Sequence, residues 1–165
     1  MGETIDIFYM LQSLLLTTFF VGLIGYERQR KHKIAGMTTH VLVAIGACAL
    51  AIVQELMVYD AIQFANDYPL SSANIVVERQ RIIAQVVAGV GFLGTGAIIK
   101  RNGNISGLTT ASTLWISAII GLIFGLGFIS LGIITSIFAL ITLTIIKRVF
   151  IGKHFDSNGE DEHEY

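Results

Sequence analysis

The sequence is poor in several residue types that are common in soluble proteins: it has one cysteine (Cys48), one proline (Pro69) and few charges. A single cysteine excludes an internal disulfide and any ligand set with several thiolates. Charged residues make up 14% of the chain, whereas soluble domains carry about 25%. Apolar residues make up 53%. A chain of 165 residues with this balance is predicted to be one integral membrane domain.

Long apolar runs are what the chain has instead. A helix needs about 20 mostly apolar residues to cross a bilayer, and five segments meet this requirement. They predict an all-α, polytopic membrane helix bundle. Its predicted spans are residues 5–26, 39–58, 81–99, 108–126 and 128–146, with a tight turn near Gly125 and Gly127. Residues 1–153 are predicted to form the transmembrane domain, and residues 154–165 an acidic, disordered tail.

The basic residues predict the orientation of these spans. They gather at residues 28–33, 100–101 and 147–153, which lie on one side of the membrane if there are five crossings. Cytoplasmic loops carry an excess of Lys and Arg. The N-terminus is therefore predicted outside and the C-terminus in the cytoplasm. The segment 60–80, which contains the proline, is predicted to be an external loop.

The composition of the third predicted span is the least typical of a helix that only contacts lipid, because it contains four glycines, Arg81 and Gln85. Small and polar residues at membrane depth indicate close helix contacts or a functional path. At 100° per residue, Arg81, Gln85, Gly89, Phe92 and Gly96 share one face. Ala84, Ala88, Gly91 and Thr95 form a small-residue stripe beside it, while Ile82, Val86, Val90 and Leu93 are expected to face lipid.

Small residues recur in the other spans, and Gly121 and Gly125 form a GxxxG pair that favours a homodimer. His40 is open to two interpretations, an interfacial hydrogen bond or a proton or metal role; whether the chain binds a metal is left open. The positions predicted to pack helices together are Gly22, Gly25, Ala84, Ala88, Gly89, Gly91, Gly96, Gly121 and Gly125.

Enzymatic and cofactor sites are not predicted. Residues 89–94 match GxGxxG, but a dinucleotide site needs a preceding strand and an acidic residue about 20 positions later. No Asp or Glu occurs between Glu78 and Asp156. No nucleophile elbow, zinc-binding HExxH or P-loop is present, so no catalytic residue is assigned. The basic first loop suits anionic lipid headgroups and does not require nucleic acid.

Three segments together resemble the MgtC/SapB family. They are GLIGYERQ at residues 22–29 followed by AGMTTH at 35–40, then RIIAQVVAGVGFLGTG at 81–96, then GLTTASTLW at 107–115. The chain departs from the family at Thr38, where a basic residue is usual, and at Glu78-Arg79, where Asp-Pro is usual. The resemblance implies a multi-pass protein of the bacterial inner (plasma) membrane, associated with growth under magnesium limitation and in some members with virulence. Functions of the soluble C-terminal domain of longer members are not carried over.

Two functions are weighed. The resemblance favours a regulator that acts through intramembrane helix contacts with a membrane protein such as the F-type ATP synthase. The alternative is a transporter or channel for Mg²⁺ or another cation. Glu27, Arg28 and His40 are expected to cluster near the cytoplasmic face, and Glu78 to pair with Arg81. The predicted polar network comprises Glu27, Arg28, His40, Glu78, Arg81, Gln85, Thr109, Thr110 and Thr113.

Overall fold

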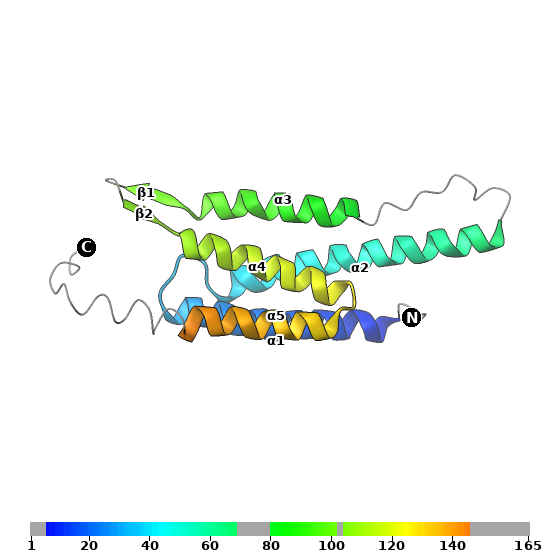
Figure 1. The fold of residues 1–165 in the computed structure, drawn as a ribbon, viewed down its shortest axis with the longest axis horizontal. Coiled ribbons are helices and arrows are strands. Elements are labelled where there is room, and N and C mark those ends of the chain that lie inside the picture. Colours follow the sequence, from blue (N-terminus) through cyan, green and yellow to red (C-terminus); the bar gives the residue numbers. More distant parts are fainter. Residues whose placement is uncertain (1–5, 69–79, 102–103, 146–165) are drawn as a thin grey trace.

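The computed structural model describes residues 6–68, 80–101 and 104–145. These residues form five helices and one β-hairpin, and the prediction of a five-helix bundle is confirmed (Figure 1). The predicted tail at 154–165 and most of the predicted external loop, at 69–79, lie outside the described residues. The elements are α1 (Ile7–Arg30), α2 (Met37–Asp67), α3 (Gln80–Gly96), β1 (Ile99–Arg101), β2 (Asn104–Ser106), α4 (Leu108–Gly125) and α5 (Ile129–Ile141).

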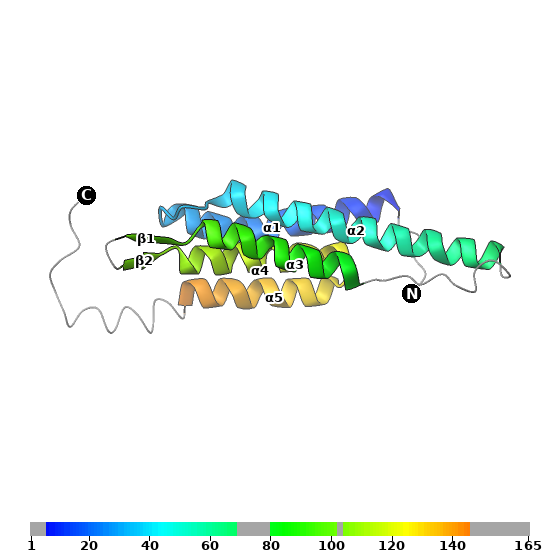
Figure 2. The ribbon, with the colours of Figure 1, turned by 90° about the horizontal axis from the view of Figure 1, so that it is seen from above.

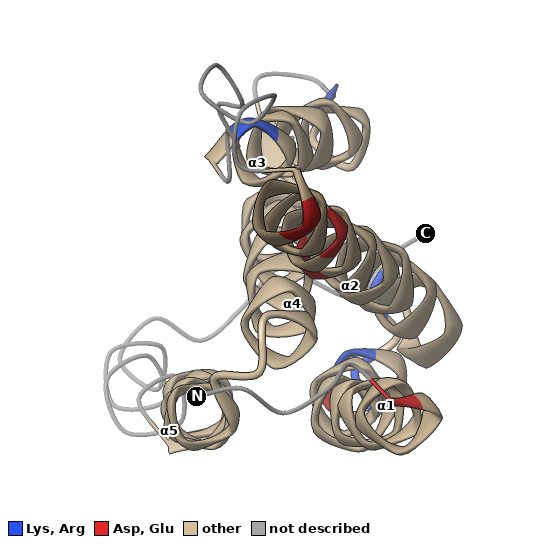
Figure 3. Cartoon of the chain, turned by 90° about the vertical axis from the view of Figure 1, so that its right-hand side faces the viewer, with Lys and Arg blue, Asp and Glu red and all other residues tan. Residues whose placement is uncertain are grey.

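Helix α4 is the centre of the bundle and contacts each of the other four helices. Figure 3, which looks along the bundle, shows α4 surrounded by its neighbours. A helix that is apolar on nearly every side belongs in the interior, and the sequence of α4 from Leu114 to Gly125 has this character. Its Ile120 and Phe124 are fully buried against Val21 and Ile24 of α1.

Two glycines let neighbouring helices approach closely. A Cβ placed on Gly25 of α1 would fall 2.6 Å from the Cα of Met37 at the start of α2. A Cβ on Gly121 of α4 would overlap the backbone carbonyl of Ala44 in α2. Contacts of backbone with backbone at this range are possible only where a side chain is missing.

The predicted turn between the fourth and fifth spans is confirmed. Helix α4 ends at Gly125, and α5 begins at Ile129. Gly127 has a φ of +82°, a conformation that glycine adopts without steric penalty. The Tyr9 hydroxyl of α1 donates a hydrogen bond to the Gly125 carbonyl at 2.7 Å, so the N-terminal part of α1 is tied to this turn.

Several helix boundaries differ from the prediction, since α1 continues to Arg30 and α5 ends at Ile141, while the predicted spans end at residues 26 and 146. Helix α2 continues to Asp67, nine residues past the predicted span, and projects beyond the other helices in Figures 1 and 2. Residues 59–67 contain no glycine or proline to stop a helix. They are too polar to be part of a predicted membrane span, so the sequence did not reveal that the helix continues. Helix α3 ends at Gly96, because the chain then turns into the antiparallel hairpin of β1 and β2.

The described basic residues of the connections gather at one end of the bundle. The α1–α2 connection, the hairpin and the last turn of α5 share that end, opposite the α4–α5 turn (Figure 1). The acidic residues of α2, Glu55, Asp60 and Asp67, are in the second half of the helix, which lies toward the other end (Figure 1). Three described helices, α1, α2 and α4, have the length and apolar composition to cross a membrane.

Helix α3 is rotated relative to its expected orientation. Val86 and Val90 were expected to face lipid, and this expectation is wrong: they are buried against Ala47 and Ala51 of α2 and Leu122 of α4. The small side chains at this contact come from α2 and α4, and the branched side chains of α3 fill the space beside them. The small-residue stripe of α3 (Ala84, Ala88, Gly91 and Thr95) is exposed instead.

Candidate functional site

Three helix ends meet at the basic end of the bundle and bring buried polar residues together. Arg28 lies in the last turn of α1, His40 in the first turn of α2, and Thr110 and Thr113 near the start of α4. The short connection from α1 to α2 forces the end of one helix beside the start of the next. The start of α4 then packs on both, since α4 contacts α1 and α2.

Arg28 is a buried charged residue whose side chain has a hydrogen-bond partner on another helix. Its side chain is 1% exposed, and its Nη2 donates a hydrogen bond to the Thr110 hydroxyl at 2.9 Å. A buried ion is tolerated when hydrogen bonds or an opposite charge replace water. Glu27 precedes it and forms an ion pair with Lys31 one turn later. This end of α1 therefore holds alternating charges at the edge of the apolar core.

His40 is fully buried and bonded on both ring nitrogens. Its Nδ1 lies 2.7 Å from the Gly36 carbonyl, which can only accept, so Nδ1 carries the hydrogen. Its Nε2 lies 2.9 Å from the Thr113 hydroxyl, and that hydroxyl lies 2.9 Å from the Thr110 carbonyl. The hydroxyl has one hydrogen for two neighbours. It donates to Nε2 when His40 is neutral and to the carbonyl when His40 is protonated.

Thr113→Val is expected to lower the free energy of unfolding by about 1 kcal/mol, because it removes the hydrogen-bond partner of a buried ring nitrogen. Valine matches threonine in shape, so the packing changes little. Unfolding in mixed micelles measures the effect. Thr142→Val is the matched control, since Thr142 is exposed and its hydroxyl donates within its own helix to Phe138. Equal stability of the two variants would contradict the role of Thr113.

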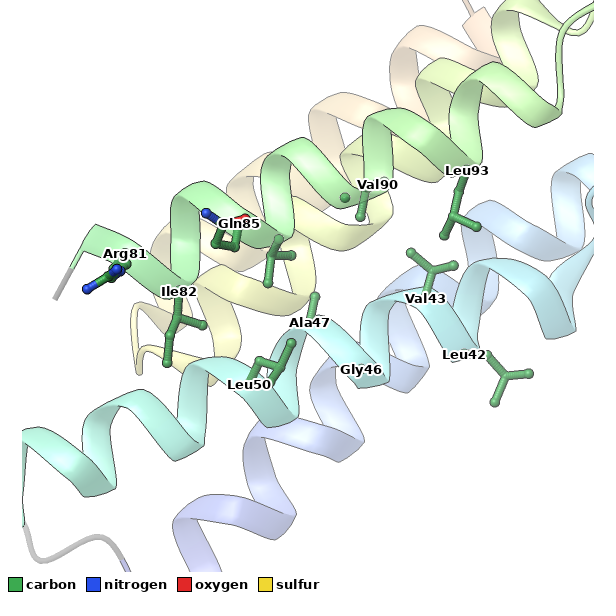
Figure 4. Close-up of a pocket in the computed structure, with 12 residues that line it drawn as sticks. Leu42, Val43, Gly46, Ala47, Leu50, Arg81, Ile82, Gln85, Val90 and Leu93 are labelled. Carbon is green, nitrogen blue, oxygen red and sulfur yellow. The ribbon is translucent and has the colours of Figure 1, made fainter. Parts of the chain in front are cut away.

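The structure divides the predicted polar network into separate groups. Glu27, Arg28, His40, Thr110 and Thr113 lie together, and we call these five residues the polar cluster. Arg81 and Gln85 are exposed near the start of α3. Figure 4 shows both of them at the same end of a groove between α2 and α3. Thr109 is exposed on α4, and Glu78 lies outside the described residues.

One polar contact that holds this site was not predicted from the sequence. The Gln29 side chain of α1 accepts a hydrogen bond from the Met37 backbone N–H at 3.2 Å. It therefore caps α2, whose N-cap, Gly36, has no side chain. Ser117 is buried and donates to the Thr113 carbonyl at 2.7 Å. A cap supplied by another helix leaves no spacing pattern, so no local sequence motif could have revealed Gln29.

A groove of about 520 Å³ runs between α4 and α5 and borders the polar cluster; its surface is mostly apolar, with several hydroxyl-bearing residues in the lining. Thr113 belongs both to the cluster and to the lining of this groove. Among the residues that the structure describes, no three His, Cys, Asp or Glu side chains gather closely enough to hold a metal ion. The other residues with hydroxyl groups in the lining are Thr109, Ser112, Thr135 and Thr142.

The residues of the polar cluster come from the sequence segments that carry the family resemblance, 22–29, 35–40 and 107–115. Comparison with known families matches residues 14–150 to the MgtC family. The chain belongs to the MgtC family. Its membership and its long apolar helices identify it as a membrane protein.

Individual relatives are similar over most of this chain. YhiD of Escherichia coli K12, whose name proposes magnesium transport, is 40% identical over 136 residues, which is 82% of this chain and 60% of YhiD. Protein MgtC of Brucella abortus is 36% identical over 76% of this chain and 46% of its own length. SrpB of Synechococcus elongatus is 40% identical over 82% of this chain and 74% of SrpB. No solved structure matches the chain.

Proposed function

We propose that this protein is a multi-pass regulator in the bacterial inner membrane that acts in adaptation to magnesium limitation. It would act by docking α3 against a transmembrane helix of a partner, such as a membrane subunit of the F-type ATP synthase. The observation that carries the proposal is the exposed small-residue stripe of α3. The relation to magnesium rests on family membership and on the name of the relative YhiD.

Surrounding lipid determines which helix surfaces associate. Lipid tails are as apolar as leucine, so helices in a bilayer associate through close packing and hydrogen bonds, and small residues permit that packing. The branched face of α3 is already buried against α2 and α4 through Val86 and Val90. The opposite stripe carries Ala84, Ala88 and Gly91, and a Cβ added at Gly91 would meet no atom within 4 Å. A partner helix can therefore approach the α3 backbone from outside.

Ala88→Leu is expected to abolish the contribution of the protein to growth in low magnesium while leaving its level in the membrane unchanged. Leucine suits lipid well, but its bulk blocks close approach by another helix. Growth of a deletion strain complemented with each variant, beside immunoblots of the membrane fraction, measures both quantities. Ala49→Leu is the matched control, because Ala49 is exposed on α2 and belongs to neither groove.

Growth like that of the wild type in the Ala88→Leu strain would refute docking through this stripe. A cysteine placed at Ala88 identifies the occupant by crosslinking in intact membranes, with Cys48 first replaced by alanine. An adduct with an ATP synthase subunit supports the named partner, whereas an adduct between two copies of this chain indicates a homodimer. A growth defect shared with Ala49→Leu would assign the effect to folding and not to docking.

A second candidate function is cation transport, and the groove between α4 and α5 favours it. Its threonine and serine oxygens are ligands for hard cations, and Thr113 connects the groove to the buried His40. The buried guanidinium of Arg28 opposes a bare cation at the same place. Flux of Mg²⁺ and monovalent cations into liposomes that contain only this protein tests the function. Flux that disappears in Thr135→Val would favour transport, and flux equal to that of empty liposomes would exclude it.

A further inference from the structure

The second groove of the protein, between α2 and α3, is apolar along most of its length and has a charge at one end. Its volume is about 520 Å³. Arg81 is the only charged side chain among the twelve described residues that line it. Figure 4 shows Arg81 and Gln85 at one end and Leu42 and Leu93 at the other, with Val43 beside them. Two glycines, Gly46 and Gly89, contribute to opposite walls.

We infer that this groove binds one anionic phospholipid, with an acyl chain between α2 and α3 and the phosphate at Arg81. This site is separate from the stripe proposed to contact a partner helix. It is lined by Arg81, Gln85, Gly89 and Leu93 of α3, whereas the stripe consists of Ala84, Ala88, Gly91 and Thr95. The two proposals can therefore fail independently.

The length of the groove fits one leaflet of a bilayer. Arg81 and Leu93 are twelve residues apart on α3, which is about 18 Å along a helix. The hydrocarbon of one leaflet is about 15 Å thick, half of a core of about 30 Å. The start of α3 lies at the same end of the bundle as the α4–α5 turn (Figure 1). Since a turn with exposed backbone groups belongs near the membrane surface, Arg81 lies at headgroup level.

The volume of the groove suits an acyl chain better than a helix. The groove is open to the outside along its length. A helix of the same length is about 10 Å across and on the order of 1,400 Å³ in volume, so the groove cannot enclose one. A single acyl chain is slender enough to lie along it.

The chemistry at the end of the groove selects the headgroup. A guanidinium binds phosphate oxygens through two parallel N–H groups, and its positive charge favours a lipid with net negative charge. Gln85 lies one turn further into the membrane than Arg81. Its amide can donate to the ester carbonyl groups that join the acyl chains to glycerol. The pair thus matches the order of phosphate, ester and hydrocarbon in a phospholipid.

Lipid binding to the purified, detergent-solubilised protein tests this inference. Native mass spectrometry during titration with phosphatidylglycerol and phosphatidylcholine of equal chain length measures each affinity. The wild type is expected to bind phosphatidylglycerol about tenfold more tightly, since the quaternary ammonium of phosphatidylcholine offsets the attraction of its phosphate for Arg81. Arg81→Gln is expected to remove this preference, and Arg81→Lys to retain part of it because the charge remains.

Two variants test the acyl-chain part of the site. Gly46→Phe and Gly89→Phe each fill the groove from one wall, and a Cβ at either position would meet no atom within 4 Å. Both are expected to weaken binding of the two lipids alike. Gly96→Phe is the control, because Gly96 is equally open but belongs neither to the groove nor to the small-residue stripe. An unchanged lipid preference in Arg81→Gln, or equal losses in Gly89→Phe and Gly96→Phe, would overturn the inference. Competition by glycerol 3-phosphate alone would also overturn it, since the acyl chain would then be irrelevant.

Discussion

Gly121→Ala is expected to lower the free energy of unfolding by about 2 to 3 kcal/mol, the effect of overpacking in a tight core. The added methyl group would occupy the position of the Ala44 backbone carbonyl. A backbone carbonyl in the middle of α2 cannot rotate away, so α2 and α4 must move apart along a contact that includes Ile120 and Phe124. The central helix of the bundle would lose packing with its largest partner surface.

Unfolding of the purified protein in mixed micelles measures this loss, and the level of protein in the membrane provides a second readout. Gly46→Ala is the matched control, since Gly46 is in α2 and an added Cβ there meets no atom within 4 Å. Alanine is a better helix former than glycine by about 1 kcal/mol, so this control is expected to be neutral or stabilising. Two variants with the same change and opposite effects would locate the close approach. Stability of Gly121→Ala equal to that of Gly46→Ala would disprove it.

Thr110→Val is expected to destabilise the protein by about 2 kcal/mol, because hydrogen bonds to charged groups contribute about 1.5 to 3 kcal/mol. The Thr110 hydroxyl accepts from the Arg28 guanidinium at 2.9 Å, and both residues are at most 2% exposed. Valine preserves the shape but leaves a buried donor of the guanidinium without this acceptor. Unfolding in mixed micelles again gives the magnitude.

A double-mutant cycle separates the hydrogen bond from other effects. Arg28→Met removes the charge, so adding Thr110→Val to it is expected to cause much less than 2 kcal/mol of further loss. Thr109→Val is the neighbouring control, since Thr109 is exposed. Additive losses in the double variant would show that Arg28 and Thr110 do not depend on one another, and the assignment of the polar cluster would then be wrong.

The polar cluster was predictable in part because its residues occur in short motifs at the ends of apolar runs. Arg28 and His40 flank the first predicted connection, so their proximity near one end followed from the chain path. The contacts with Thr110 and Thr113 did not follow, because they join residues 82 and 73 positions apart. Which helices become neighbours depends on the packing of the whole bundle. Arg81 and Gln85 lie at a groove and not in the polar cluster, and this too depends on how the whole bundle packs.

The sequence by itself determined that the chain is a membrane protein built of five helices, since runs of apolar residues cannot be covered by so few charges in water. It also determined the turn at Gly127, where only glycine adopts the required φ easily. The tertiary structure alone decided the rotation of α3. The valines and the small residues of that helix can both pack against neighbours, and the available space beside Ala47 and Ala51 selected the valines. The small-residue stripe is therefore exposed, and the proposed regulatory contact depends on that exposure.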